Sequence, residues 1–247
     1  MSTSITTSNK KENGILSNSK QTRSVNDTPG KILLICGIIS SLWYVAINIY
    51  VPRFFPGYHS ASQTVSELSA IDAPTRQLWN LMAIPYTLLV TAFGCGVLKS
   101  AGPNRRLRIA GVLLVVYGAM GILWPFAPMH LREALAAGEG NHSDTLHIGL
   151  AVVTEVIYLL ALGFAATALG KRFRIYSILT FLLLFVFGVL TFRDAPSISS
   201  NLPTPLIGIW ERINIGLFLV WIIVLGSVLL RNKYNSSIEM TRGKMKS

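Results

Sequence analysis

Long uncharged, apolar stretches alternate with short polar segments along most of the chain. Each of the six stretches runs for 18 to 23 residues, and a single acid, Glu155, interrupts one of them. A membrane-crossing helix needs about 20 mostly apolar residues, and inside a bilayer each backbone amide must bond within its own segment. The pattern therefore predicts an all-α fold, a polytopic membrane helical bundle with six transmembrane helices. The stretches are residues 32–52, 77–98, 109–129, 148–170, 175–192 and 213–230.

The polar segments at the two ends of the chain contrast with this apolar middle. Residues 1–30 are rich in Ser, Thr, Asn and Lys and hold few apolar residues, so they cannot bury a core. We expect a disordered cytoplasmic tail over 1–30, a six-helix transmembrane domain over 31–232 and a basic cytoplasmic tail over 233–247. Cys36 and Cys95 lie in apolar stretches and indicate neither a disulfide framework nor a zinc site.

The charges are few and unevenly placed. Charged residues make up 13% of the chain, about half the share in a soluble domain, and the net charge is +11. Of the 22 Lys and Arg residues, 17 fall on the side of the six predicted spans that also holds both termini. Cytoplasmic loops carry this excess, so we expect a cell-membrane protein with both termini cytoplasmic. The positive charge matches anionic lipid headgroups, so the expected partners are membrane lipids and not nucleic acid; the sequence names no protein partner.

The first connection on the opposite, outer side, about residues 52–75, holds the first candidate site residues. Ser60 with Gln63, and Thr64 with Glu67, each have the spacing of a capping box. These side chains either cap and pack a short helix, or Ser62, Ser66 and Glu67 belong to a polar catalytic site. The connection has no Gly-x-Ser-x-Gly elbow for a nucleophilic serine, so both interpretations stay open.

The second outer connection, about residues 125–143, and the start of the next span hold histidines beside carboxylates. His130 and Glu133 are three residues apart, as are Asp144 and His147. On a helix this spacing lets a carboxylate orient an imidazole for acid–base or metal chemistry. His130, Asp144 and His147 are therefore catalytic candidates, with surface and capping roles as the alternative. No metal ligand is assigned and the cofactor stays unknown.

Glu155 is the one acid inside a predicted span. A carboxylate deep in a bilayer costs about 2.5–3.5 kcal/mol on insertion scales, so it must face the bundle and find a partner. It lies eight residues after His147, on about the same helix face. Glu211 and Arg212 enter from the same side on the last span. We expect these residues to form a buried polar strip, with Arg212 as the first choice of partner for Glu155 and Asn214 or Asn80 as alternatives.

Three segments together resemble a known family. The first is the string from His59 to Ala70, His-Ser-Ala-Ser-Gln-Thr-Val-Ser-Glu-Leu-Ser-Ala, followed by a proline and a span. The others are Pro-Phe-Ala-Pro-Met-His at residues 125–130 and the Asp144-x-x-His147 start of the fourth span. They are similar to the domain-of-unknown-function 998 family over about residues 32–231. The resemblance implies six spans in a mostly prokaryotic membrane protein and implies no reaction.

Three functions remain open on the sequence. The first is a multi-pass membrane protein of unassigned activity that acts as a non-catalytic scaffold or accessory protein. The second is an outer-face enzyme or binding protein for lipids, which would use the His/carboxylate cluster. The third is a small proton-coupled transporter that would use Glu155, although no internal repeat or broken helix pair supports it.

Overall fold

The computed structural model describes residues 27–244, and they form an all-helical protein. Over this range there is no strand, and the only β-pairing is an isolated bridge between Ile71 and His130. The predicted all-α class is confirmed. The α-helices are α2 (Thr28–Tyr50), α3 (Arg76–Ser100), α4 (Arg105–Met120), α5 (Arg132–Ala136), α6 (His142–Ala168), α7 (Lys171–Ser199) and α8 (Ile207–Lys244), and the short 3₁₀ helices are η2 (Val51–Phe54), η3 (Ser66–Ser69) and η4 (Trp124–Phe126).

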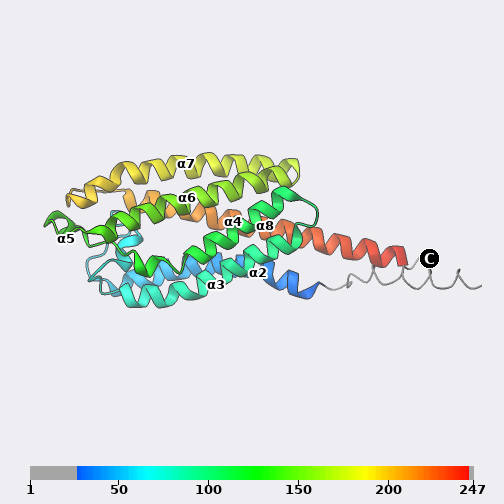
Figure 1. The fold of residues 1–247 in the computed structure, drawn as a ribbon, viewed down its shortest axis with the longest axis horizontal. Helices are drawn as coiled ribbons and strands as arrows, with labels where there is room; N and C mark the ends of the chain where they lie inside the picture. The colour runs from blue at the N-terminus through cyan, green and yellow to red at the C-terminus, as the bar shows by residue number, and fades with distance from the viewer. Residues whose placement is uncertain (1–26, 245–247) are drawn as a thin grey trace, which may run out of the picture.

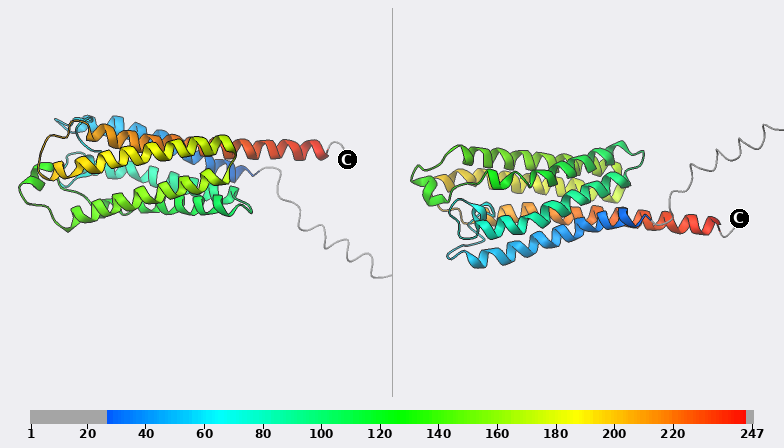
Figure 2. Two further views of the ribbon diagram at one scale, coloured as in Figure 1. Left: turned by 90° about the horizontal axis from the view of Figure 1, so that it is seen from above. Right: turned by 60° about the horizontal axis from the view of Figure 1, so that its bottom comes forward.

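Six long helices lie side by side along one axis (Figures 1 and 2), and their contacts form a closed ring. Each of α2, α3, α4, α6 and α7 packs against the next one along the chain, and α8 closes the ring by packing against both α7 and α2. Short connections force neighbouring helices to run antiparallel. The connections therefore gather at two ends of the bundle. We call them the loop end, which holds residues 51–75, 121–141 and 200–206, and the terminal end, which holds residues 101–104 and 169–170, the start of α2 and Lys233.

Side chains in the connections fix where the helices begin. Asp27 caps α2 by accepting a hydrogen bond from Gly30 N (3.1 Å), and Asn104 caps α4 by accepting from Leu107 N (3.1 Å). α6 begins with a capping box formed by Asn141 and Asp144. Each cap satisfies amides that have no partner within their helix.

Glycines bring α3 and α4 into close contact. A Cβ added at Gly111 would lie 2.8 Å from Leu98 N, and one added at Gly118 would lie 2.7 Å from Thr91 N. Backbones approach this closely where small residues face each other, as in membrane helix pairs. Larger residues at these two positions would push the helices apart.

Aromatic side chains fill the interior of the ring. Phe218 stacks on Tyr158 and Trp221 with ring centroids 4.5 and 5.9 Å away, and Phe93 is fully buried. The outside is also apolar: α7 alone exposes Leu182 and a run of similar side chains. A soluble monomer rarely exposes such a surface, so this is the surface of a membrane-like helical protein.

Five of the described helical segments are long and apolar enough to cross a membrane. The third predicted span differs from expectation, because α4 ends at Met120 although the uncharged stretch runs on to residue 129. Pro125 and Pro128 lie in that remainder, and proline lacks the amide that a continuing helix needs. The length of an uncharged stretch therefore overstates the helix here.

The two predicted tails also differ in how much of each the structure describes. Most of residues 1–30 lie outside the described residues, but α2 already begins at Thr28. At the other end, α8 continues to Lys244 and projects beyond the bundle (Figure 2). Residues 233–244, part of the predicted basic tail, thus continue the helix of the last span.

Candidate functional site

Glu67 is the centre of a polar network at the loop end. Its side chain is fully buried and forms a two-pronged ion pair with Arg132, with Nη2 to Oε1 at 2.7 Å and Nε to Oε2 at 3.2 Å. Thr64 N donates to Oε1 (3.1 Å) and Gln63 Nε2 donates to Oε2 (2.9 Å). A buried carboxylate is stable only when its oxygens are saturated in this way. The expected Thr64–Glu67 capping box is present, because Glu67 N also donates to Thr64 Oγ1.

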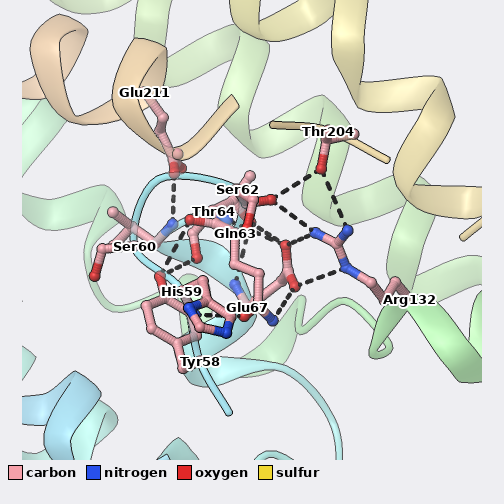
Figure 3. Close-up of polar contacts among 12 residues, drawn as sticks. Tyr58, His59, Ser60, Ser62, Gln63, Thr64, Glu67, Arg132, Thr204 and Glu211 are labelled. Atoms are coloured by element: carbon pink, nitrogen blue, oxygen red, sulfur yellow. Dashed lines mark hydrogen bonds and ion pairs between the residues drawn. The ribbon is translucent and has the colours of Figure 1, made fainter. Parts of the chain in front are cut away.

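Arg132 joins three connections of the loop end (Figure 3). Besides holding Glu67, it donates to the Ser62 carbonyl and to Thr204 Oγ1, each at 3.2 Å. Thr204 in turn donates to the same Ser62 carbonyl (2.9 Å). One guanidinium therefore ties together the first connection, α5 and the segment before α8.

The first connection also covers the beginning of α8. Gly208 N and Ile209 N donate to the Ala61 carbonyl at 3.0 and 3.3 Å, and Val65 N donates to the Glu211 carboxylate at 2.5 Å. Arg212 donates from Nη1 to the Ser60 carbonyl at 2.8 Å. The free amides of this helix start are thus satisfied by a loop from a distant part of the sequence.

Tyr58 fastens the other side of the same connection. Its hydroxyl donates to the Thr64 carbonyl (2.7 Å) and accepts from Arg212 Nη2 (2.6 Å). Burial raises the pKa of this hydroxyl well above its ordinary value, against the opposing effect of the Arg212 charge. Tyr58 therefore stays neutral at any physiological pH, and its hydroxyl links the Thr64 carbonyl to Arg212 through hydrogen bonds.

His130 and Asp144 form a second polar pair at the loop end. Nδ1–H of His130 donates to Asp144 Oδ2 (2.8 Å), and His130 N donates to Oδ1 (2.7 Å). Asp144 also completes the capping box of α6 by accepting from Asn141 N (2.9 Å). The expected pairing of His130 with Glu133 is wrong, because His130 precedes α5 and turns toward the start of α6.

His147 is buried beneath this pair. Its Nδ1 atom lies 2.8 Å from the Ala127 carbonyl, and its ring meets Trp124 edge to face at 5.1 Å. Asp144 binds His130 and not His147. The second connection is therefore fastened to α6 by two imidazoles, each held through Nδ1.

Glu155 faces the inside of the bundle, as expected, but its partner differs from our first choice. It accepts hydrogen bonds from Tyr158 of its own helix and from Asn214 Nδ2 of α8 (3.3 Å). Arg212 is turned away toward Ser60 and Tyr58. The polar strip of Glu155, Glu211 and Arg212 is thus divided: Glu155 belongs to the interior, and the other two hold the first connection.

The sequence-predicted candidates are brought to one end of the molecule, in two separate clusters. Glu67 and the Ser62 carbonyl belong to the Arg132 network, whereas His130, Asp144 and His147 form the other cluster. Ser66 begins η3, and its carbonyl accepts from the Ser69 hydroxyl (3.1 Å). Sequence reasoning missed Arg132, although a buried Glu67 demands a cation and few lie on this side. Among the side chains that the structure describes, no three His, Cys, Asp or Glu residues are grouped as metal ligands would be.

The fold and the network define a class of protein: a membrane-like helical bundle with its connections locked into a polar cap at one end. The family described as "Protein of unknown function (DUF998)" matches residues 38–228. The chain belongs to this family, and the resemblance seen in the sequence is confirmed. No curated protein and no solved structure matches the chain.

Proposed function

We propose that the chain is a non-catalytic accessory protein of the cell membrane, with six spans and both termini in the cytoplasm. The observation that carries the proposal is the saturation of Glu67, whose two oxygens accept five hydrogen bonds from three residues at zero exposure. A general base needs an oxygen within reach of a substrate. This carboxylate instead holds the loop end in one shape, as the surface of a scaffold requires.

The ring geometry supports a sixth crossing by α4. Lys233 of α8 reaches Asp27 at the start of α2 (Nζ to Oδ2, 2.6 Å), so the first and last long helices meet at the same end. An even number of crossings brings them there, and α4 packs between α3 and α6 along the same bundle. With Trp124 in the 3₁₀ turn that follows, α4 continues toward the loop end.

The sidedness of the proposal comes from charge. The Lys and Arg residues of the short 101–108 and 169–174 segments lie at the terminal end, and such short basic segments stay in the cytoplasm. Reporter fusions after Arg105, Lys171 and Lys244 should all give a cytoplasmic signal, and a fusion after Glu139 an external one. A single reversed signal would overturn the topology.

The test of an accessory role is the membrane proteome of a deletion strain. Loss of an accessory protein destabilises its partners, so one or a few membrane proteins should fall in abundance. Wild type and Ser66→Ala should restore them, and Arg132→Met, which loosens the cap, should restore them less. An unchanged proteome combined with an altered lipid composition would contradict the accessory role.

A second candidate function rests on the His130–Asp144 pair. A carboxylate on Nδ1 fixes the tautomer that leaves Nε2 as a base, and Nε2 of His130 makes no hydrogen bond within residues 27–244. This arrangement fits a lipid-modifying enzyme at the membrane surface.

His130→Asn separates the two candidates. An asparagine amide donates from about the position of Nδ1 and so keeps the bond to Asp144, while Nε2 is removed. The accessory role predicts full restoration of the deletion strain by this variant. The enzymatic role predicts a lipid composition like that of the deletion strain, with the variant folded and present at the wild-type level.

A further inference from the structure

A groove runs between α2 and α8 in the half of the bundle next to the loop end. Its volume is about 410 Å³, within the range of sites that hold small molecules. Val45 and Ile49 line one side and are themselves about half exposed. Leu219 and Ile215 line the other side. The wall is thus apolar and opens toward the outside of the ring.

Gly216 leaves the α8 side of the groove open. It belongs to the lining, and a Cβ added there would meet nothing within 4 Å. A glycine inside a helix lowers the stability of that helix. No neighbouring backbone comes close enough to Gly216 to require a residue without a side chain. The glycine therefore leaves space in the groove, and no close contact between helices requires it.

The end of the groove near the first connection is polar and positively charged. Arg212 donates to the carbonyls of Ser60, Gln63 and Gly208 and to the Tyr58 hydroxyl, all of them neutral acceptors. It forms no ion pair with any of the residues that the structure describes. The neighbouring Glu211 carboxylate accepts from Val65 N instead. Arg212 therefore brings a positive charge to the groove without a direct carboxylate contact, although the nearby Glu211 lies within its electrostatic reach.

Asn48, which also lines the groove, has a side-chain acceptor without a hydrogen-bond donor. Its Nδ2 group donates to the Tyr44 carbonyl (3.0 Å), but its buried Oδ1 atom has no hydrogen-bond partner. A buried acceptor without a donor costs free energy. A ligand that completes this site must combine an anion for Arg212, a hydroxyl or amine donor for Asn48, and an apolar chain for the wall.

We propose that the groove between α2 and α8 binds one molecule of phosphatidylglycerol from the surrounding leaflet. Its phosphodiester lies at Arg212, a headgroup hydroxyl donates to Asn48 Oδ1, and one acyl chain follows the wall past Gly216. A net negative charge and free hydroxyls distinguish this lipid from phosphatidylcholine, which has neither. The proposal rests on the membrane embedding proposed above and not on the accessory role.

Native mass spectrometry tests the site on the full-length protein. The protein is released from phosphatidylcholine vesicles that contain phosphatidylglycerol as a minor component, and bound lipids are counted. Gly216→Leu places a side chain in the groove, where an added Cβ meets nothing within 4 Å. Gly163→Leu on α6 is the matched control, because a Cβ there also meets nothing within 4 Å. The tightly held phosphatidylglycerol should fall about tenfold or more in Gly216→Leu and stay at the wild-type level in Gly163→Leu.

A second variant and a measurement of the oligomeric state distinguish a lipid site from other uses of the groove. Asn48→Leu should also lower phosphatidylglycerol retention, and it leaves the Arg212 contacts in place. Equal retention in wild type and Gly216→Leu would overturn the lipid site, as would equal retention of phosphatidylcholine and phosphatidylglycerol. A wild-type dimer that Gly216→Leu converts to a monomer would assign the groove to a second copy of the chain. None of these variants touches the Glu67–Arg132 network, so a failure here leaves the accessory role standing.

Discussion

A carboxylate paired with basic side chains holds each end of the bundle, one cation at the loop end and two at the terminal end, but the two carboxylates differ in burial. At the loop end, the Glu67 side chain is 0% exposed and Arg132 is 12% exposed. At the terminal end, Asp27 binds Lys99 and Lys233 while remaining 35% exposed, with Lys99 at 46%. A buried charge depends on its partner, whereas water replaces the partner of an exposed one. Similar contacts should therefore carry very different free energies.

The largest effect is expected at Arg132. Arg132→Met removes the one cation that pairs with the buried Glu67 in the described part of the chain, and breaking such a pair costs about 3–5 kcal/mol. Thermal unfolding of the purified protein in detergent should show a large loss of stability. The exposed Arg193, paired with Asp194 at 2.9 Å, offers the control, and Arg193→Met should change stability by about 1 kcal/mol or less.

The double variant sharpens this expectation. If the cost comes from an unpaired buried charge, Glu67→Leu combined with Arg132→Met should recover a large part of the stability lost in Arg132→Met alone, because apolar replacements of buried pairs are often tolerated. Additive losses would mean that the pair holds the loops chiefly through the Ser62 and Thr204 contacts.

A middle-sized effect is expected at Asp144. Asp144→Ala removes the Asp144 half of the α6 capping box and both bonds to His130, for a loss of about 1–3 kcal/mol. The change should be local, because the Arg132 network does not include Asp144. Hydrogen exchange should accelerate over residues 125–141 and stay at the wild-type rate over residues 58–69. Equal acceleration in both segments would show that the two clusters at the loop end form one unit.

The smallest effect is expected at Asp27. Its hydrogen bonds with Lys233 and then Lys99 hold the pKa of the carboxyl well below its usual range. Solvent screening limits the contribution to about 1 kcal/mol or less. Because the folded pKa is lowered, this stabilisation is complete above the ordinary Asp pKa of about 3.9 and is lost as pH falls through the lowered pKa.

The difference between wild type and Asp27→Asn measures this contribution. It should be visible at pH 7 in low salt, shrink in high salt, and decline below about pH 4. A difference that is insensitive to salt would place Asp27 in the same category as Glu67 and remove the contrast between the two ends.

The parts of the fold that the sequence predicts are those with a local cause. Spans follow from uncharged length, and the Thr64–Glu67 cap follows from a spacing of three residues. Helix bounds are harder, because residues 121–129 are as uncharged as the span before them yet form turns around two prolines. Apolar character alone does not distinguish a helix from a loop that lies against one.

Pairings between distant segments could not be predicted in the same way. His130 is closer in sequence to Glu133 than to Asp144, and Arg212 is two residues from Asn214, which binds Glu155. Which one meets a given carboxylate depends on the rotation and depth of each helix in the ring. Arg132 meets Glu67 across 65 residues of sequence for the same reason, and only the assembled loops bring them together.

The closed ring has a consequence for how the chain could be connected. Because α8 packs on α2 and Lys233 lies against Asp27, a linker could join the chain at these two residues without crossing the bundle. Turns 101–104 and 169–170 lie at that same end. A new N-terminus at 101–104 would place α2 and α3 after α8 in the sequence, and one at 169–170 would place the first four long helices after α8. No helix would change its direction in the ring. The native helix order is thus one of three circularly permuted orders that would give the same ring, with every helix running in the same direction. Cuts at the loop end would interrupt the polar cap and place both new termini on the opposite face.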